Sequence, residues 1–329
     1  MGSVWNDITA TSEPICHVDS GIQTDHPDLK GVMLDSLNFV PTSDDYADYP
    51  IDQDTKEAKN VEDACGHGTH TAGIMAAVGN NGLGVSGVAW RAQLYVCRFI
   101  WADGTGFLSD AAACLDWCRS KGVKISSNSW GSFSISKTMQ EAVKADRAAG
   151  SLFVAAAGND NLNADNKEVY PASLVRTPTF DASHMIVVAA HDALDNIAGF
   201  SNYGVLSVHL AAPGVGVLST VMGSDYDRMD GTSMACPIVA ATAALLRARA
   251  RAFGLTMTMA QLRDTILTSV KVLPSSPRLI TKGKLDAKEA FAVLYDLLRE
   301  KKLMPGTPRR RLPPPSPPPP RYPPPPPPP

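Results

Sequence analysis

Residues 14–22 of this chain are Pro14-Ile15-Cys16-His17-Val18-Asp19-Ser20-Gly21-Ile22. The apolar start of the stretch predicts a buried strand over 14–18, and Asp19 follows it directly. Asp19 then lies at the carboxyl end of a strand, which is the edge where open α/β sheets place their active sites. The stretch therefore predicts both the first strand of a sheet and a candidate functional turn.

Similar apolar runs recur along the chain and alternate with segments of helical period. Further strands are predicted at 93–99, 122–126, 151–155, 185–190 and 205–210. Helices are predicted at 67–77, 108–120, 136–149, 233–252, 258–268 and 286–299. Alternating strands and helices imply parallel strands joined by crossovers. We therefore expect a three-layer α/β fold with a mostly parallel central sheet.

The composition is that of a globular protein. The chain has 329 residues, of which 44% are apolar and 19% charged, and its formal net charge is -3. A nearly neutral chain gives no reason to expect a nucleic-acid partner. No stretch approaches ~20 consecutive apolar residues, so we expect no membrane span. The first residues lack the basic and then apolar pattern of a signal peptide.

Two more motifs carry side chains that are able to do chemistry. One is Gly66-His67-Gly68-Thr69-His70-Thr71, and the other is Gly231-Thr232-Ser233-Met234-Ala235-Cys236-Pro237. Taken singly, Asp19, His67 and Ser233 would be interpreted as a turn aspartate, a structural histidine and a helix N-cap. Together they supply a nucleophile, a base and the carboxylate that orients the base.

In the order Asp, His, Ser, the three motifs resemble the signature of subtilisin-like serine proteases, the subtilases. The resemblance runs from about residue 14 to about residue 303 and implies a subtilisin-like fold and serine endopeptidase activity. It implies that Ser233 attacks the scissile carbonyl, that His67 accepts the proton of Ser233, and that Asp19 holds His67. The intermediate would be an acyl-enzyme.

A fourth match concerns the oxyanion hole. Ala155-Ala156-Ala157-Gly158-Asn159 follows a predicted strand and resembles the family segment that carries the oxyanion donor. The resemblance implies that Asn159 acts together with the backbone N–H of Ser233. An ordinary turn asparagine is the alternative.

The resemblance also implies a set of substrate-binding segments. An edge segment that pairs with an extended substrate is expected at Gly104, Thr105 and Gly106. Two walls of the main specificity pocket are expected at Ser129, Trp130, Gly131, Ala157 and Gly158. Leu108 and Ala111 match positions that shape a pocket for a residue further upstream. Because both are apolar, we expect apolar or neutral side chains there rather than a dibasic requirement.

A structural calcium ion is the cofactor that the resemblance implies. Its expected ligands are the Asp28 carboxylate, the Asn81 side chain and the carbonyls of Gly79, Leu83 and Val85. A glycine-rich turn without metal is the alternative. The acidic segment 44–63 is expected to be a solvated loop, with a second calcium site as its alternative. His70 is interpreted as structural, since the pattern His-Glu-x-x-His is absent.

The cysteine pattern leaves the pairing open. Six cysteines allow 15 full pairings, and each could equally be a small buried apolar residue. Cys114 and Cys118 lie four residues apart on a predicted helix and therefore share a face.

The ends of the chain suggest two regions. We expect a catalytic domain over 1–303 with a truncated N-terminus and no pro-segment, so that a pro-segment inhibitor would be a separate partner. The proline-rich tail, 304–329, is expected to be extended and disordered. Protein or peptide substrates and a location in the secretory route are implied by the resemblance. The alternative is a catalytically impaired relative whose tail docks a proline-recognition domain or forms a rigid spacer in a hydroxyproline-rich wall.

Overall fold

The computed structural model describes residues 1–40, 57–273 and 278–305. Most of the acidic segment 44–63 and nearly all of the proline-rich tail 304–329 lie outside these residues. The predictions made for those two segments therefore stay predictions.

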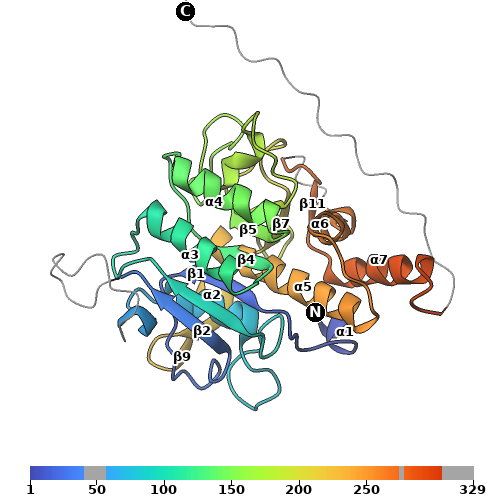
Figure 1. The fold of residues 1–329 in the computed structure, drawn as a ribbon, viewed down its shortest axis with the longest axis horizontal. Coiled ribbons are helices and arrows are strands. Elements are labelled where there is room, and N and C mark those ends of the chain that lie inside the picture. Colours follow the sequence, from blue (N-terminus) through green and yellow to red (C-terminus); the bar gives the residue numbers. More distant parts are fainter. Residues whose placement is uncertain (41–56, 274–277, 306–329) are drawn as a thin grey trace, which may run out of the picture.

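A central sheet organises the described residues, and it is mostly parallel as predicted (Figure 1). Its strand order is β10-β11-β7-β6-β5-β4-β1-β3-β2, and the β10–β11 pair alone is antiparallel among these strands. The strands are β1 (Ile15–Asp19), β2 (Met33–Asn38), β3 (Leu94–Arg98), β4 (Ile125–Asn128), β5 (Leu152–Ala156), β6 (Met185–His191), β7 (Leu210–Pro213), β10 (Lys271–Val272) and β11 (Gly283–Lys284). A separate antiparallel hairpin consists of β8 (Val217–Val221) and β9 (Asp225–Met229).

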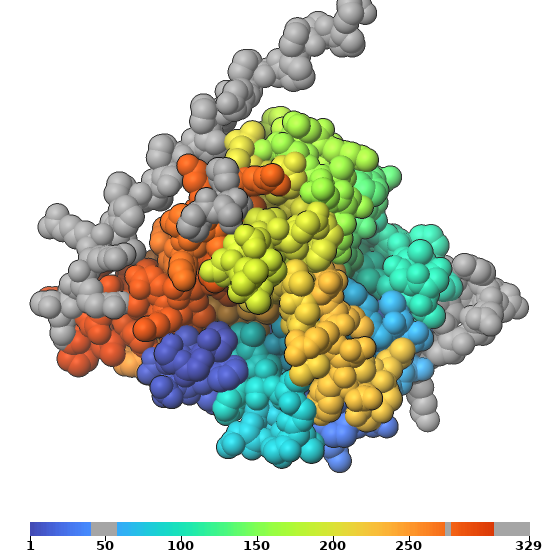
Figure 2. Space-filling view, turned by 180° about the vertical axis from the view of Figure 1, so that it is seen from behind, coloured from blue at the N-terminus to red at the C-terminus, as the bar shows by residue number. Residues whose placement is uncertain are grey.

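Helices cover both faces of the sheet and complete the expected α/β architecture (Figure 1). They are α1 (Gly2–Trp5), α2 (His67–Ala76), α3 (Leu108–Ser120), α4 (Lys137–Ala148), α5 (Thr232–Ala252), α6 (Met259–Thr268) and α7 (Ala287–Glu300). None of the helices in the described part of the chain is long and apolar enough to cross a membrane. In Figure 2 the dark blue N-terminal residues lie against the orange and red C-terminal segments, and α1 packs on α7.

The alternation of side chains along each strand divides the core into two layers. On β1, Ile15 packs in the layer that contains α2 and α5. Cys16 and Val18 pack in the layer that contains α3 and α4. Because successive side chains of a strand point to opposite faces, His17 and Asp19 lie on the same face as Ile15. The strand therefore directs Asp19 toward α2 and α5.

The predicted strand over 205–210 is wrong, because β7 begins only at Leu210. The carboxylate of Asp165 accepts hydrogen bonds from the N–H of Leu206 and the hydroxyl of Ser207, which hold this segment in a turn. Strand β2 and the β8–β9 hairpin were not predicted. Pro237 lies inside α5, in its second turn, where it cannot donate to the carbonyl of Ser233 four residues earlier. That carbonyl accepts instead from the hydroxyl of Ser129. Asp286 is the N-cap of α7 and accepts from the N–H of Glu289.

Two disulfides attach α3 to the sheet. Cys118 is bonded to Cys16 of β1, and Cys114 is bonded to Cys97 of β3. Both helical cysteines lie on the face of α3 that packs on the sheet, and β1 and β3 are hydrogen-bonded neighbours. Cys65 and Cys236 are free. The helix that begins at Leu108 is thus fixed to two adjacent strands.

The two disulfides should differ in their contribution to stability. They join residues 102 and 17 positions apart, respectively. The chain-entropy estimate is about 4.7 kcal/mol for a loop of ~100 residues and about 3 kcal/mol for a short one. We expect the Cys16→Ala/Cys118→Ala variant to lose more free energy of unfolding than Cys97→Ala/Cys114→Ala. Denaturant-induced unfolding of the two variants measures the difference, and an equal or reversed ranking would contradict the loop-length argument.

Candidate active site

The candidate residues gather at the carboxyl edge of three neighbouring parallel strands. Asp19 ends β1, Ser129 follows β4, and Asn159 follows β5 by three residues. In the sheet these strands lie in the order β5-β4-β1. The parallel arrangement therefore brings together residues that are far apart in the sequence, at the edge where ligands bind in α/β folds.

Asp19, which is buried, and His67, which is half-buried, form an acid–base pair. The Nδ1 atom of His67 lies 2.7 Å from Oδ1 of Asp19, which also accepts the N–H of Ser20 at 2.8 Å. Burial alone would raise the pKa of Asp19, but the charge and hydrogen bond of His67 hold it below its usual value. Burial alone would lower the pKa of His67, but the Asp19 carboxylate raises it overall. The arrangement favours an imidazole that is oriented by, and stabilised as a cation by, one carboxylate.

Asp63 holds the start of α2 and was not predicted as a site residue. Its Oδ1 accepts from the backbone N–H groups of Cys65 and Gly66 and from the hydroxyl of Ser20. Its Oδ2 accepts from the N–H and hydroxyl of Thr69. In the sequence, Asp63 belongs to the acidic segment 44–63, which is expected to be a solvated loop. Its spacing of four residues before His67, ahead of a helix, was the signal that could have identified it.

Ser233 lies in the first turn of α5, a helix that packs against α2 and against five strands of the sheet. Its hydroxyl donates to the carbonyl of Ser129 at 3.2 Å. The hydroxyl of Ser129 donates in turn to the carbonyl of Ser233 at 3.0 Å. These reciprocal bonds hold Ser233 beside the end of β4. As a first-turn residue, Ser233 has a backbone N–H without an intrahelical acceptor.

Asn159 is tied to the residue before Ser233. Its Oδ1 accepts from the N–H of Thr232 at 2.9 Å and from the hydroxyl of Thr232 at 2.8 Å. A backbone N–H can only donate, so the oxygen of the Asn159 amide must face Thr232. The Nδ2 group is consequently the part of this exposed side chain that is left to contact another molecule.

The segments predicted as walls of a substrate pocket lie close together. A Cβ added to Gly131 would lie 3.3 Å from the Val169 side chain, and one added to Gly158 would lie 3.4 Å from it. The two walls thus share Val169 as a neighbour. Trp130 packs edge-to-face on Phe99, with ring centroids 5.3 Å apart. The exposed segment 104–106 returns to the end of β3, where Gly106 forms a bridge with Ile100.

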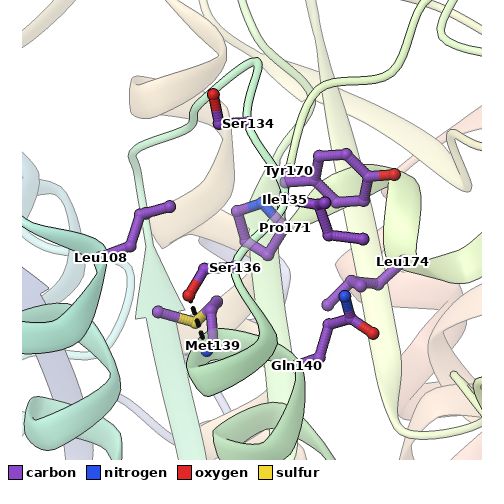
Figure 3. Close-up of a pocket in the computed structure, with 9 residues that line it drawn as sticks. All are labelled: Leu108, Ser134, Ile135, Ser136, Met139, Gln140, Tyr170, Pro171 and Leu174. Atoms are coloured by element: carbon purple, nitrogen blue, oxygen red, sulfur yellow. Dashed lines mark hydrogen bonds between the residues drawn. The ribbon is translucent and has the colours of Figure 1, made fainter.

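A small surface hollow lies beside Leu108 at the start of α3 (Figure 3). Its other lining residues come from the segment before α4, from α4 itself and from the region around Pro171; they are Ser134, Ile135, Ser136, Met139, Gln140, Tyr170, Pro171 and Leu174. Most of these side chains are apolar. Leu108 lines the hollow, whereas Ala111 is fully buried and does not line it.

The predicted calcium ligands partly come together. Asp28 is buried; its Oδ1 contacts Nδ2 of Asn81 at 2.5 Å, and its Oδ2 accepts the N–H of Val85 at 3.0 Å. No Lys or Arg pairs with Asp28 in the described residues. A buried carboxylate whose hydrogen-bond donors are neutral offers the hard oxygen chemistry that Ca²⁺ prefers. The Asn81 amide, however, presents its nitrogen to Asp28 and uses its oxygen to accept from Leu83.

His70 is buried in α2, and its Nε2 lies 3.1 Å from the carbonyl of Asp227 in β9. Within the described ranges, no group of three or more His, Cys, Asp or Glu side chains could hold a metal. The calcium set predicted from the sequence contains one carboxylate, so this finding leaves that prediction open.

Comparisons with known proteins agree on one family. The model of the subtilase family, Peptidase_S8, matches residues 12–293. Subtilisin BL of Lederbergia lenta is 37% identical over 240 residues, which cover 73% of this chain and 78% of that protein. Thermitase of Thermoactinomyces vulgaris is 33% identical over 286 residues, covering 87% and 91%. A solved protease structure from Pseudoalteromonas arctica PAMC 21717 superposes with a TM-score of 0.74 at 27% identity, covering 89% of this chain and 93% of that one.

Replacing Asp63 by asparagine should change both stability and the titration of His67. The negative charge of Asp63 contributes to raising the pKa of His67, so Asp63→Asn should lower that pKa. A single amide oxygen cannot accept all five bonds, and we expect a loss of about 2 kcal/mol of unfolding free energy. NMR titration of the His67 ring and denaturant unfolding measure the two effects.

The control for this experiment is Asp165→Asn. Asp165 also accepts backbone and hydroxyl donors, but in the turn before β7. This control should lower stability without moving the His67 titration. An unchanged pKa of His67 in Asp63→Asn would show that Asp63 does not act on the imidazole.

Proposed function

The chain belongs to the subtilase family and is a serine-type endopeptidase, and we propose that Asp19, His67 and Ser233 are its catalytic triad. The observation that carries the proposal is the 2.7 Å contact between Asp19 and His67, at the edge of the sheet where Ser233 lies in the first turn of α5. The substrates of such an enzyme are proteins or peptides.

The proposed reaction follows from the roles of the three side chains. Ser233 Oγ attacks the scissile carbonyl as its proton passes to Nε2 of His67, and a tetrahedral oxyanion forms. His67 then donates that proton to the leaving amine, which gives an acyl-enzyme. Water, deprotonated by His67, hydrolyses the acyl-enzyme and regenerates Ser233. Asp19 stays ionised throughout and stabilises the cationic form of His67.

Asn159 is proposed to stabilise the oxyanion together with the N–H of Ser233. The fixed orientation of its amide supports this role, because Thr232 occupies the oxygen and leaves Nδ2 to donate. A donor held in place before the reaction needs no reorganisation when the charge develops. The hydrogen bond from the Ser233 hydroxyl to the Ser129 carbonyl would break when the Ser233 side chain turns to His67. The bond from the Ser129 hydroxyl to the backbone carbonyl of Ser233 would remain.

The substrate is proposed to bind in an extended form along 104–106 and between Ser129–Gly131 and Ala157–Gly158. The apolar hollow next to Leu108 supports acceptance of an apolar side chain several residues before the cleaved bond. We further propose that residues 1–303 form one catalytic domain and that 304–329 are a separate tail.

We also propose a structural calcium ion bound by Asp28 and the loop from Gly79 to Val85. The support is the buried Asp28 carboxylate, which has no Lys or Arg partner in the described residues. Binding would require the Asn81 amide to turn so that its oxygen faces the ion. Calcium would join chain segments that are far apart in the sequence, so its effect would be on stability.

A secretory or extracellular location is proposed from the disulfides. Cys16–Cys118 and Cys97–Cys114 both link core elements, and such bonds form and persist in oxidising compartments. A pro-segment inhibitor remains a proposed partner.

The triad proposal is tested by labelling with a fluorophosphonate. Ser233→Ala should abolish labelling and lower kcat by several orders of magnitude, since the nucleophile is lost. Asn159→Ala should keep labelling but lower kcat about 10²–10³-fold with little change in KM, which is the loss seen when one such donor is removed in subtilisin. Asn163→Ala is the matched control, because the Asn163 side chain also accepts a backbone N–H in the same loop. A wild-type chain that folds but is not labelled would refute the triad and favour the impaired alternative.

The calcium proposal is tested by thermal unfolding in the Ser233→Ala background, where autolysis cannot interfere. An ion that binds only the folded state adds about 2.7 kcal/mol at a hundredfold excess over Kd. Millimolar calcium should therefore raise Tm relative to EDTA, and Asp28→Asn should remove the difference. Asp25→Asn, an exposed carboxylate three residues away, should retain it. Equal Tm values in calcium and EDTA would contradict the calcium proposal and favour the alternative, a glycine-rich turn without metal.

A further inference from the structure

A second histidine, His17, lies behind the carboxylate of the proposed triad. His17 and Asp19 are two residues apart on β1 and so lie on the same face of the sheet. The His17 ring is buried, and its Nε2 lies 2.9 Å from Oγ1 of Thr71 and 3.7 Å from Oδ2 of Asp19. Neither His17 nor Thr71 has a role in the proposed peptide hydrolysis itself.

Thr71 links His17 to Asp19. It follows His67 by four residues on α2, so both side chains lie on one face of the helix. His67 contacts Oδ1 of Asp19 at 2.7 Å, and Thr71 contacts Oδ2 at 3.0 Å. One helical turn therefore approaches both oxygens of a single buried carboxylate.

The hydrogen-bond geometry assigns a direction to these contacts. The Thr71 hydroxyl has one proton and two nearby acceptors, Oδ2 of Asp19 at 3.0 Å and the carbonyl of Gly68 at 3.2 Å. The ionised carboxylate is the stronger acceptor. If Thr71 donates to Asp19, its oxygen must accept from His17, so the proton of the His17 ring is on Nε2.

The other ring nitrogen agrees with that assignment. Nδ1 of His17 is buried and has no hydrogen-bond partner in the described residues. A buried N–H without an acceptor is the rarer case, which favours a lone pair at this position. Burial lowers the pKa of His17, and the ionisable groups that act on it are Asp19, Asp63 and His67. The lowered pKa and the unpartnered Nδ1 both favour a neutral His17 with its proton on Nε2.

We propose that His17 and Thr71 form a positioning relay that fixes the Asp19 carboxylate against His67. This inference rests on the proposed triad. The relay runs from His17 Nε2–H to Thr71 Oγ1 and from Thr71 O–H to Asp19 Oδ2. It supplies a neutral donor to the carboxylate, so Asp19 stays ionised and oriented without a second cation beside His67. A cation at position 17 would instead weaken the attraction of Asp19 for protonated His67.

Two substitutions of Thr71 separate positioning from packing. Thr71→Val keeps the volume and removes the hydroxyl, whereas Thr71→Ser keeps the hydroxyl and removes a methyl group. We expect Val to lower kcat about 10-fold, the scale of one lost hydrogen bond to a charged group, with KM little changed. Without its donor, Asp19 attracts protonated His67 more strongly, so the acid limb of the pH–kcat profile should move to higher pH. Thr71→Ser should keep both kcat and the acid limb near wild type. If Thr71 only filled space, Thr71→Ser would be the more impaired variant and Thr71→Val would be close to wild type.

Two substitutions of His17 test the other end of the relay. His17→Gln retains an N–H donor that does not titrate, and it should keep most of the activity. His17→Phe removes the donor and should lower kcat about 10-fold, the same scale of loss. The control is His184→Phe: His184 is also buried, but it directly precedes β6, at the edge of the sheet opposite Asp19. It should change Tm and leave kcat unaltered.

Labelling of the wild type and of Ser233→Ala by a fluorophosphonate is measured first. An unlabelled, folded wild type would refute the proposed triad irrespective of the relay. If the wild type is labelled, the relay is overturned when Thr71→Val and His17→Phe both keep kcat within twofold of wild type and the acid limb of their pH–kcat profiles does not move. If His17→Phe does not fold, the Val and Ser variants of Thr71 decide the question.

Discussion

The site depends on one buried negative charge. The Asp19 side chain is 1% exposed, and a carboxylate removed from water is costly unless donors surround it. Here the donors come from three sources: the N–H of Ser20, the ring of His67 and the hydroxyl of Thr71. Because two of them lie on α2, the need to satisfy Asp19 also fixes how that helix is placed on the sheet.

A second carboxylate fixes the same helix from its other side. Asp63 binds the first turn of α2 and the hydroxyl of Ser20, which in turn accepts the N–H of Gly68. Asp19 and Asp63 thus share Ser20 as a neighbour and act on one imidazole through charge. The start of α2 is held by side-chain acceptors although its N-cap residue, Gly66, has no side chain of its own.

Helices α5 and α3 fix the edge of the sheet where Asp19, His67 and Ser233 lie. Helix α5 is buried along most of its length, and its first turn is tied to the ends of β4 and β5 through Ser129 and Asn159. On the opposite face, α3 is bonded covalently to β1 and β3, so the segment before it, which includes Gly104–Gly106, has a fixed anchor. A hydrolytic site requires such rigidity, since small displacements of reacting groups cost rate.

The sequence by itself determined the alternation of strands and helices, the parallel sheet and the three motifs with their order. Those features are local, because an apolar run or a glycine-rich turn is visible within a few residues. The disulfide partners, the role of Asp63, the hairpin of β8 and β9, and the contact of His17 with Thr71 were decided only by the tertiary structure. Cys114 and Cys118 could be placed on one helix face, but not opposite Cys97 and Cys16. Each of these contacts joins residues whose proximity depends on strand order and on how a helix lies across the sheet, and no short stretch of sequence contains that information.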